Sequence, residues 1–323
     1  MSQIRFDQVS LRFPGATRPA VDRCSGTIES GELVVILGPS GCGKTTLLKM
    51  VNRLYEPTSG SIYLGDRDIR QVSRTALRRQ IGYVIQQGGL FPHMTVAQNI
   101  GVVPKLLGWS RPRIQARIDE LLILVELPPQ EFRRRYPAQL SGGQQQRVGL
   151  ARALAGDPQV MLMDEPFGAI DAITRTTLQD EILRLQRQLQ KTILFVSHDV
   201  EEALRLADRL LIMRQGQIIQ FDTPFRVLTQ PADSFVRELV GANDMVRQLG
   251  LLRVRSVMLT TAEPYPISSE LTLSPDDTLR RALSLMLQTG AEKLMVVEQG
   301  RAIGLITLDE IRRSSQPQPI KEM

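Results

Sequence analysis

The sequence has few cysteines, few aromatic residues and no long apolar run. Two cysteines in 323 residues, Cys24 and Cys42, are too few for a disulfide framework. The longest apolar runs, such as 33–37, fall far short of the ~20 residues that a membrane-spanning helix needs. The N-terminal ten residues lack the apolar core of a signal peptide. We therefore expect a chain of the reducing cytosol that has no membrane span of its own.

The composition is that of a soluble globular protein. Hydrophobic residues make up 42% and charged residues 23% of the chain, which excludes disorder and a bilayer-embedded bundle. A length of 323 residues at roughly 150 per domain predicts about two domains.

The net charge of +6 is concentrated in the middle of the chain, where residues 105–155 hold nine basic and four acidic residues. Two interpretations stay open for this stretch: a charged partner, or a solvated arginine-rich helical face. The stretch has no zinc-finger spacing, recognition-helix pattern or aromatic-rich basic sheet, so we expect no nucleic acid partner.

Strand and helix signals alternate in a way that predicts an α/β fold. A β-type run at 33–37 is followed by a glycine-rich turn and a helix at 44–54. Further buried strands are predicted at 160–163 and 192–196, with an amphipathic helix between them. This alternation favours a parallel sheet.

Other segments follow different patterns. The first 30 residues and 61–69 alternate apolar and polar residues, which predicts a small antiparallel sheet. Residues from about 89 to 156 predict an all-helical insert, with one helix starting at Ser110.

The last part of the chain predicts a separate small α+β unit. Residues 241–254 are predicted to be a linker and 255–313 the unit itself, with strands at 294–297 and 302–307. Ser274 is predicted to be the N-cap of its helix, since Pro275 follows it. Residues 314–323, rich in Gln and Pro, are predicted to be a flexible tail.

Residues 38–45 match the phosphate-binding pattern G-x4-G-K-[ST] between a predicted strand and a predicted helix. Glycines let backbone N–H groups surround phosphates, and the helix N-terminus adds positive charge. We expect Lys44 to reach the β- and γ-phosphates and the Thr45 hydroxyl to bind magnesium. Cys42 is most simply a small filler, with a redox role as the alternative. The predicted nucleotide-binding residues here are Gly38, Pro39, Ser40, Gly41, Cys42, Gly43, Lys44, Thr45 and Thr46.

Two adjacent carboxylates end the predicted strand at 160–163. The carboxyl end of a parallel strand lies at the edge where the phosphate loop is expected. We expect Asp164 to hold magnesium and Glu165 to orient or deprotonate the attacking water.

A second anion-binding pattern lies at Leu140–Gln144. Its small residues, Ser141, Gly142 and Gly143, expose backbone N–H groups before a helix that begins near Gln144. Since one nucleotide does not obviously need two such cradles, we expect the second to serve the nucleotide of another subunit.

Together these motifs resemble the ATP-binding cassette (ABC) family, over residues 1–240 and in the expected order. The resemblance implies that Phe13 stacks on adenine, although Phe6 and Phe13 both lie in the N-terminal sheet and either can belong to the core. It implies that Gln86 binds magnesium and couples nucleotide to a membrane partner. It also implies that Asp171 lies in a loop crossing a dimer interface and that His198 contacts the γ-phosphate. A structural role is the other interpretation of His198 taken alone.

The implied fold is a P-loop NTPase core with an antiparallel β subdomain and a helical subdomain at about 89–156. The implied function is that of a head-to-tail homodimer that binds ATP and Mg²⁺ between its chains. Such a dimer drives transmembrane permease subunits, and indirectly a substrate-binding protein, from the cytoplasmic side of the membrane.

A narrower resemblance is to the ATPases of osmoprotectant importers, which take up glycine betaine, carnitine or choline. It rests on the runs 81–87, 89–96 and 50–54. The C-terminal unit resembles a single CBS repeat. Either two chains pair their single repeats or the unit is a vestige. For its role, sensing of a ligand or of ionic strength and stabilisation of a dimer both stay open. Two alternatives for function stay open: a motor for another solute, or a soluble ABC ATPase acting on ribosomes or DNA.

Overall fold

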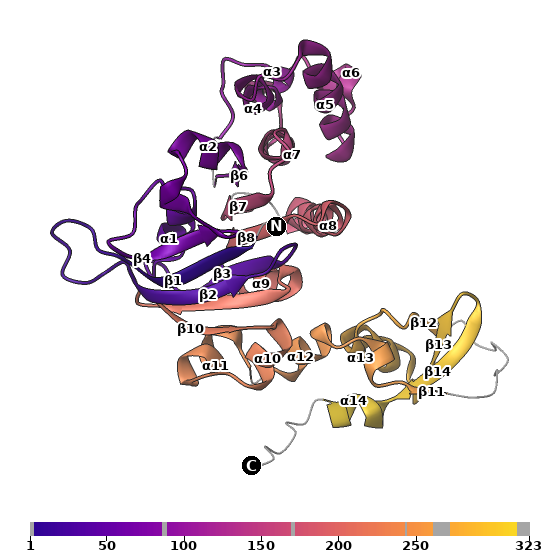
Figure 1. The fold of residues 1–323 in the computed structure, drawn as a ribbon. Helices are drawn as coiled ribbons and strands as arrows, with labels where there is room; N and C mark the ends of the chain where they lie inside the picture. The colour runs from indigo at the N-terminus through magenta and orange to yellow at the C-terminus, as the bar shows by residue number, and fades with distance from the viewer. Residues whose placement is uncertain (1–2, 86–88, 169–171, 243, 261–271, 315–323) are drawn as a thin grey trace. The chain divides into compact units, whose positions relative to one another are not determined.

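The computed structural model describes residues 3–85, 89–168, 172–242, 244–260 and 272–314 (Figure 1). The chain divides into two compact units, Met1–Phe221 and Asp222–Met323.

The larger unit is built on a six-stranded sheet with the order β10-β9-β3-β8-β7-β6. From β9 to β6 all neighbouring strands are parallel. Every residue of β3, β7 and β8 is buried, which explains why their sequences are nearly continuous apolar runs and not alternating ones. The predicted strands and parallel sheet are confirmed. The strands are β3 (Leu33–Leu37), β6 (Ile81–Val84), β7 (Val160–Asp164), β8 (Thr192–Val196), β9 (Arg209–Arg214) and β10 (Gln217–Asp222).

Helices lie between these strands in the sequence: α1 (Lys44–Val51), α2 (Arg74–Arg79), α8 (Ala172–Leu189) and α9 (Val200–Leu206). The prediction that the first helix extends to residue 54 is wrong. It ends at Val51, because Arg53 takes a left-handed conformation with φ 47°.

A second sheet, with the order β2-β1-β4-β5, is antiparallel throughout. Its apolar residues, among them Ile4 and Phe6, share one core with Ile36 and Leu47 of the phosphate-loop region. The predicted small antiparallel sheet is confirmed, and this core fixes it beside the parallel sheet. Its strands are β1 (Ile4–Leu11), β2 (Val21–Ile28), β4 (Ser59–Leu64) and β5 (Arg67–Asp68).

Between β6 and β7 the described residues from 89 onward are helical or irregular, which confirms the helical insert. Ser110 is the N-cap of α5, as predicted.

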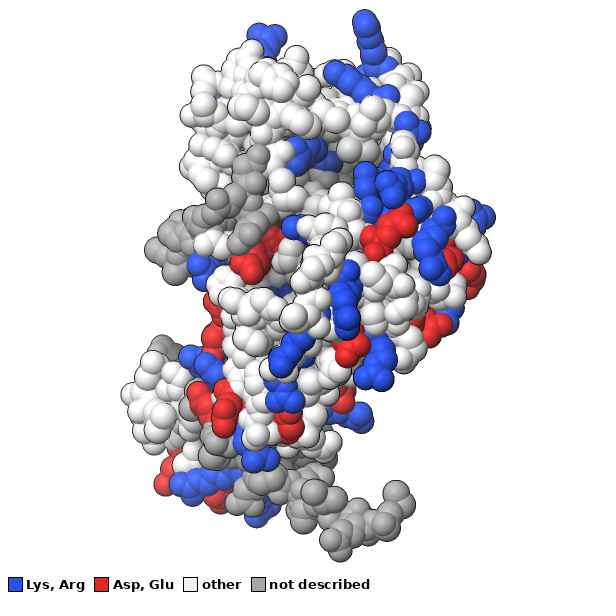
Figure 2. All heavy atoms as spheres, turned by 90° about the vertical axis from the view of Figure 1, so that its left-hand side faces the viewer, with Lys and Arg blue, Asp and Glu red and all other residues white. Residues whose placement is uncertain are grey.

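Several basic residues of the insert form ion pairs within it, such as Arg133 with Asp119 and Arg117 with Glu120. Figure 2 shows basic side chains scattered over one face, several of them beside acidic ones. This favours a solvated helical face. The helices are α3 (Val96–Ile100), α4 (Val102–Leu106), α5 (Arg111–Leu124), α6 (Pro129–Phe132) and α7 (Gly142–Leu154).

The second unit contains helices and a four-stranded sheet with the order β11-β14-β13-β12. The predicted strands correspond to β13 and β14, which pair antiparallel. Residues 241–254, predicted to be a linker, include α12, which packs against α10 and α13. The compact unit begins at Asp222, whereas the predicted boundary is residue 240. The elements are α10 (Pro224–Thr229), α11 (Ser234–Val240), α12 (Met245–Leu251), β11 (Leu259–Thr260), β12 (Thr272–Leu273), α13 (Leu279–Thr289), β13 (Lys293–Glu298), β14 (Arg301–Thr307) and α14 (Leu308–Ser314).

The predicted start of α13 at Ser274 is wrong. The N-cap is Thr278, whose hydroxyl accepts from Arg281 N. Ser274 instead begins a turn, in which its carbonyl accepts from Asp277 N at 3.0 Å. Backbone bonds from Val254 and Arg255 to this turn hold it outside the helix.

None of the helices in the described part of the chain has the length and apolar character needed to cross a bilayer.

We expect Gly60→Ala to destabilise the larger unit much more than Gly15→Ala. Both glycines have φ near +76°, but a Cβ at Gly60 would lie 2.2 Å from Gln8 O, whereas a Cβ at Gly15 would meet nothing within 4 Å. Gly15→Ala should therefore cost about 1–2 kcal/mol from the left-handed conformation alone. Gly60→Ala should cost at least about 2 kcal/mol more, because the strand pair must also separate. Chemical denaturation measures both, and equal losses would contradict the close approach of β1 and β4.

Candidate functional site

The loop between β3 and α1 has a shape that requires glycine at two places. Gly38 has φ 156°, and a Cβ there would lie 2.3 Å from Met213 O. Gly43 has φ 108°, and its Cβ would lie 2.3 Å from Ala20 O. The loop is thus packed closely against β9 and the segment before β2, with the N-terminus of α1 directly after it. This is the strand, loop and helix arrangement predicted for a phosphate-binding loop.

Lys44 begins α1 and is buried, with 6% of its surface exposed. Its ammonium donates to Gly38 O at 2.8 Å and to Pro39 O at 3.0 Å. Among the described residues, no carboxylate forms an ion pair with it. A buried cation that has only neutral acceptors is costly, and an anion bound in the loop would neutralise it.

Thr45 and Asp164 bring two oxygen ligands together beside this loop. The Thr45 hydroxyl donates to Asp164 Oδ1 at 2.8 Å, and Asp164 is buried at the end of β7. Hydroxyl and carboxylate oxygens are the ligands that Mg²⁺ prefers, usually together with water and substrate phosphates. The donor set fits a divalent cation bound to a nucleotide.

Tyr83, to which no sequence motif gives a role in the site, lies next to Asp164. It extends from β6, the strand paired with β7. Burial, and then the charge of Asp164 and a hydrogen bond to it, raise the pKa of Tyr83 above its usual range. The phenol therefore stays protonated at neutral pH. Its place near the carboxyl end of a strand beside β7 is a signal that could have identified it.

Glu165 and His198 lie close together at the same edge. His198 Nδ1 is 3.1 Å from Glu165 Oε2. Glu165 has a left-handed φ of 43°, and its N–H donates to Val196 O at 3.1 Å. This turn directs the carboxylate away from the buried strand and toward the segment after β8. The arrangement suits a carboxylate acting on water beside an imidazole that contacts a phosphate.

The second predicted cradle is at the N-terminus of α7. Ser141 is its N-cap and forms a capping box with Gln144, in which Ser141 Oγ accepts from Gln144 N and Gln144 Oε1 accepts from Ser141 N. Ser141 and Gly142 are exposed, and a Cβ at Gly142 would meet nothing within 4 Å. Contacts within the described chain therefore do not explain this glycine.

Phe13 and Phe6 have different environments. Phe6 is 2% exposed and belongs to the core, whereas Phe13 is 37% exposed. The Phe13 ring meets Tyr55 edge-to-face, with centroids 5.2 Å apart. Phe13 is therefore the one of the two that is accessible to a base. Tyr55 was not singled out in the sequence.

Cys42, Gln86 and Asp171 are three further predicted residues. Cys42 is buried, and burial raises the pKa of its thiol, which suits a filler more than a redox centre. Gln86 and Asp171 lie outside the described residues.

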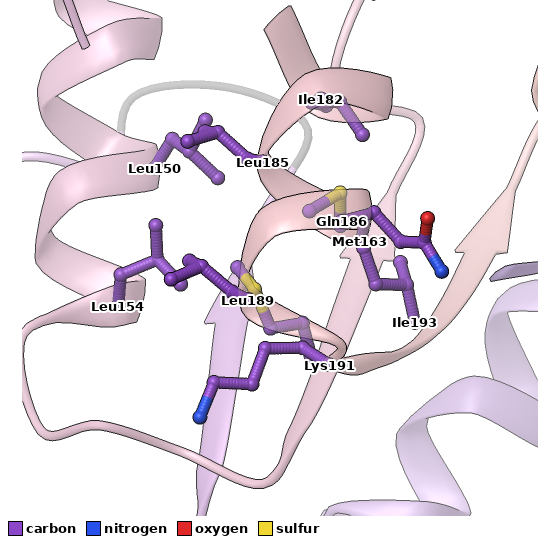
Figure 3. A pocket seen from close by; sticks show the side chains of 10 residues that line it. Leu150, Leu154, Met163, Ile182, Leu185, Gln186, Leu189, Lys191 and Ile193 are labelled. Atoms are coloured by element: carbon purple, nitrogen blue, oxygen red, sulfur yellow. The ribbon is translucent and has the colours of Figure 1, made fainter. Parts of the chain in front are cut away.

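A small hollow between α7 and α8 is a poor alternative site (Figure 3). Aliphatic side chains such as Leu150, Leu185 and Ile193 form most of its lining, and Gln186 and Lys191 are its polar members. A polyphosphate would find few donors there.

Comparisons with known proteins give two family matches. The model of the ABC transporter family matches residues 21–168, and the model of the CBS domain matches residues 254–316.

Two relatives cover nearly the whole chain. The carnitine transport ATP-binding protein OpuCA of Listeria monocytogenes is 47% identical over 310 residues, which is 95% of this chain and 76% of that protein. The glycine betaine uptake system ATP-binding protein YehX of Escherichia coli is 48% identical over 309 residues, which is 95% of this chain and 98% of that protein.

Among solved structures, the ATP-binding cassette MJ0796, described as dimeric and bound to ADP and Pi, is similar with a TM-score of 0.62 and 31% identity. The match covers 68% of this chain and 98% of that one.

Proposed function

The chain belongs to the ATP-binding subunits of ABC transporters, and from this premise we propose that it drives the import of osmoprotectants through separate permease subunits. The observation that best supports a nucleotide site here is the buried Lys44 ammonium, which has no carboxylate partner in the part of the chain that the structure describes. The γ-phosphate of ATP would replace the two carbonyl acceptors and give this cation its counter-charge.

We assign hydrolysis to Glu165 and His198. Glu165 accepts a proton from the attacking water or orients it, and His198, 3.1 Å away, contacts the γ-phosphate. Phe13 stacks on the adenine ring, which its exposure allows.

Mg²⁺ would be held by Thr45 and, through water, by Asp164, with Gln86 as a further ligand. Bound there, the ion neutralises charge on the phosphates. Tyr83 supports this site by donating to the Asp164 carboxylate.

The second cradle, Ser141–Gln144, binds the γ-phosphate held by the other chain of a head-to-tail homodimer. The N-terminus of a thirteen-residue helix suits an anion, and a Cβ at Gly142 would meet no other described residue within 4 Å, which leaves room for one. Asp171, which is outside the described residues, is the further residue that we propose to act at this interface.

The cargo is proposed from the relatives. One relative described above is named for carnitine transport and the other for glycine betaine uptake, and each match covers 95% of this chain. The binding of such cations belongs to aromatic residues of a substrate-binding protein. We place the dimer on the cytoplasmic face of the membrane, against its permease.

We expect Glu165→Gln to slow ATP hydrolysis by about 10²- to 10⁴-fold, because the amide cannot accept the proton of water. ATP binding should persist, since the amide leaves the loop around Lys44 intact. Phosphate release and nucleotide-binding assays measure the two effects. As a control, Glu120→Gln changes an exposed carboxylate of α5 and should match the unaltered protein. If the Glu165→Gln variant hydrolyses ATP at the normal rate, Glu165 has no role in hydrolysis.

We expect cells that lose the gene to lose uptake of labelled glycine betaine, carnitine or choline under salt stress. Restoring the gene should restore uptake, and the Lys44→Ala form should not, because it lacks the cation that binds the phosphates. Unchanged uptake of all three solutes would refute the proposed cargo while leaving the ATPase assignment intact.

A further inference from the structure

His198 is exposed, but both residues that flank it are fixed. Ser197 is 2% exposed, and its N–H donates to Ile36 O of β3 at 3.1 Å. Asp199 is the N-cap of α9. The position of the imidazole therefore depends on how these two neighbours are held.

Glu202, on the first turn of α9, contacts both neighbours of His198. Its Oε2 accepts a hydrogen bond from Ser197 Oγ, and its N–H donates to Asp199 Oδ1 at 3.1 Å. Asp199 N in turn donates to Ser197 Oγ at 3.0 Å. These three bonds close a ring around the backbone of His198.

The Glu202 carboxylate is buried, with 6% of the residue exposed. Its other oxygen accepts from Gln179 Nε2 of α8 at 3.2 Å. Burial raises the pKa of Glu202, while the hydrogen bonds from Ser197 and Gln179 act in the opposite direction. A buried carboxyl group lowers the stability of the folded protein relative to an apolar side chain at the same place. We therefore expect Glu202 to have a function.

The same network reaches α8 at two points. Gln179 is itself 5% exposed, and Arg175 Nη1 of α8 lies 3.4 Å from Asp199 Oδ2. Helix α8 begins at Ala172, directly after the predicted interface residue Asp171. A shift of α8 would therefore move the residues on both sides of His198.

We propose that Glu202 is a positioning residue. It holds the His198 imidazole beside the Glu165 carboxylate, and it links the position of this imidazole to helix α8. The proposal rests on the role of His198 in the proposed function. Glu202 itself touches no reacting atom, and it acts through Ser197 and Asp199.

The test measures kcat and KM for ATP in Glu202→Ala. We expect kcat to fall about 10-fold and KM to change less than about twofold, since the phosphate loop is untouched. Glu202→Gln should recover most of the loss, because an amide can still accept from Gln179 and donate to Ser197 Oγ. An equal loss in both variants would overturn the proposal.

A double-mutant cycle separates positioning from a general structural effect. In a His198→Ala background, Glu202→Ala should cause little further loss of kcat, because the side chain that it positions is gone. Losses that multiply would show that Glu202 acts independently of His198 and would overturn the proposal.

If Glu202→Ala does not fold, Ser197→Ala tests the same proposal, with Ser10→Ala as its matched control. Both hydroxyls are buried and accept a backbone N–H, from Asp199 and from Arg23 respectively. We expect Ser197→Ala to lower kcat several-fold and Ser10→Ala to leave it unchanged at a similar melting temperature. Equal kcat values would overturn the positioning role, whereas an unaltered protein that hydrolyses no ATP would refute the proposed function instead.

Discussion

The proposed nucleotide site depends on a buried lysine ammonium that forms no ion pair with any carboxylate of the described residues. The phosphate loop can hold Lys44 there because glycine at positions 38 and 43 lets the backbone approach Met213 O and Ala20 O closely. The parallel strands then bring Asp164 and Glu165 to the same edge.

The parts of the structure that were predicted correctly are those in which a local pattern determines the outcome. The buried strands β3, β7 and β8 are each predicted from a short run of apolar residues within the strand itself. The phosphate loop is equally local, because strand, glycines and helix are contiguous in the sequence.

The parts that were missed depend on contacts between distant residues. Tyr83 and Asp164 are far apart in the sequence and meet because β6 pairs with β7. Ser274 has the residue pattern of an N-cap, but bonds from Val254 and Arg255 hold its turn outside the helix. Glu202 resembles an ordinary acidic residue of a helix start until Ser197 and Gln179 are seen beside it.

The central claim is that each ATP lies between the phosphate loop of one chain and the Ser141–Gln144 cradle of another. The most direct test mixes two inactive variants, Lys44→Ala and Ser141→Arg. In a mixed dimer both defects fall in one site and the other site is intact, so ATPase activity should return to about a quarter of the unaltered level. Activity that stays at zero, while mixed dimers form and bind ATP, would contradict a site shared between chains.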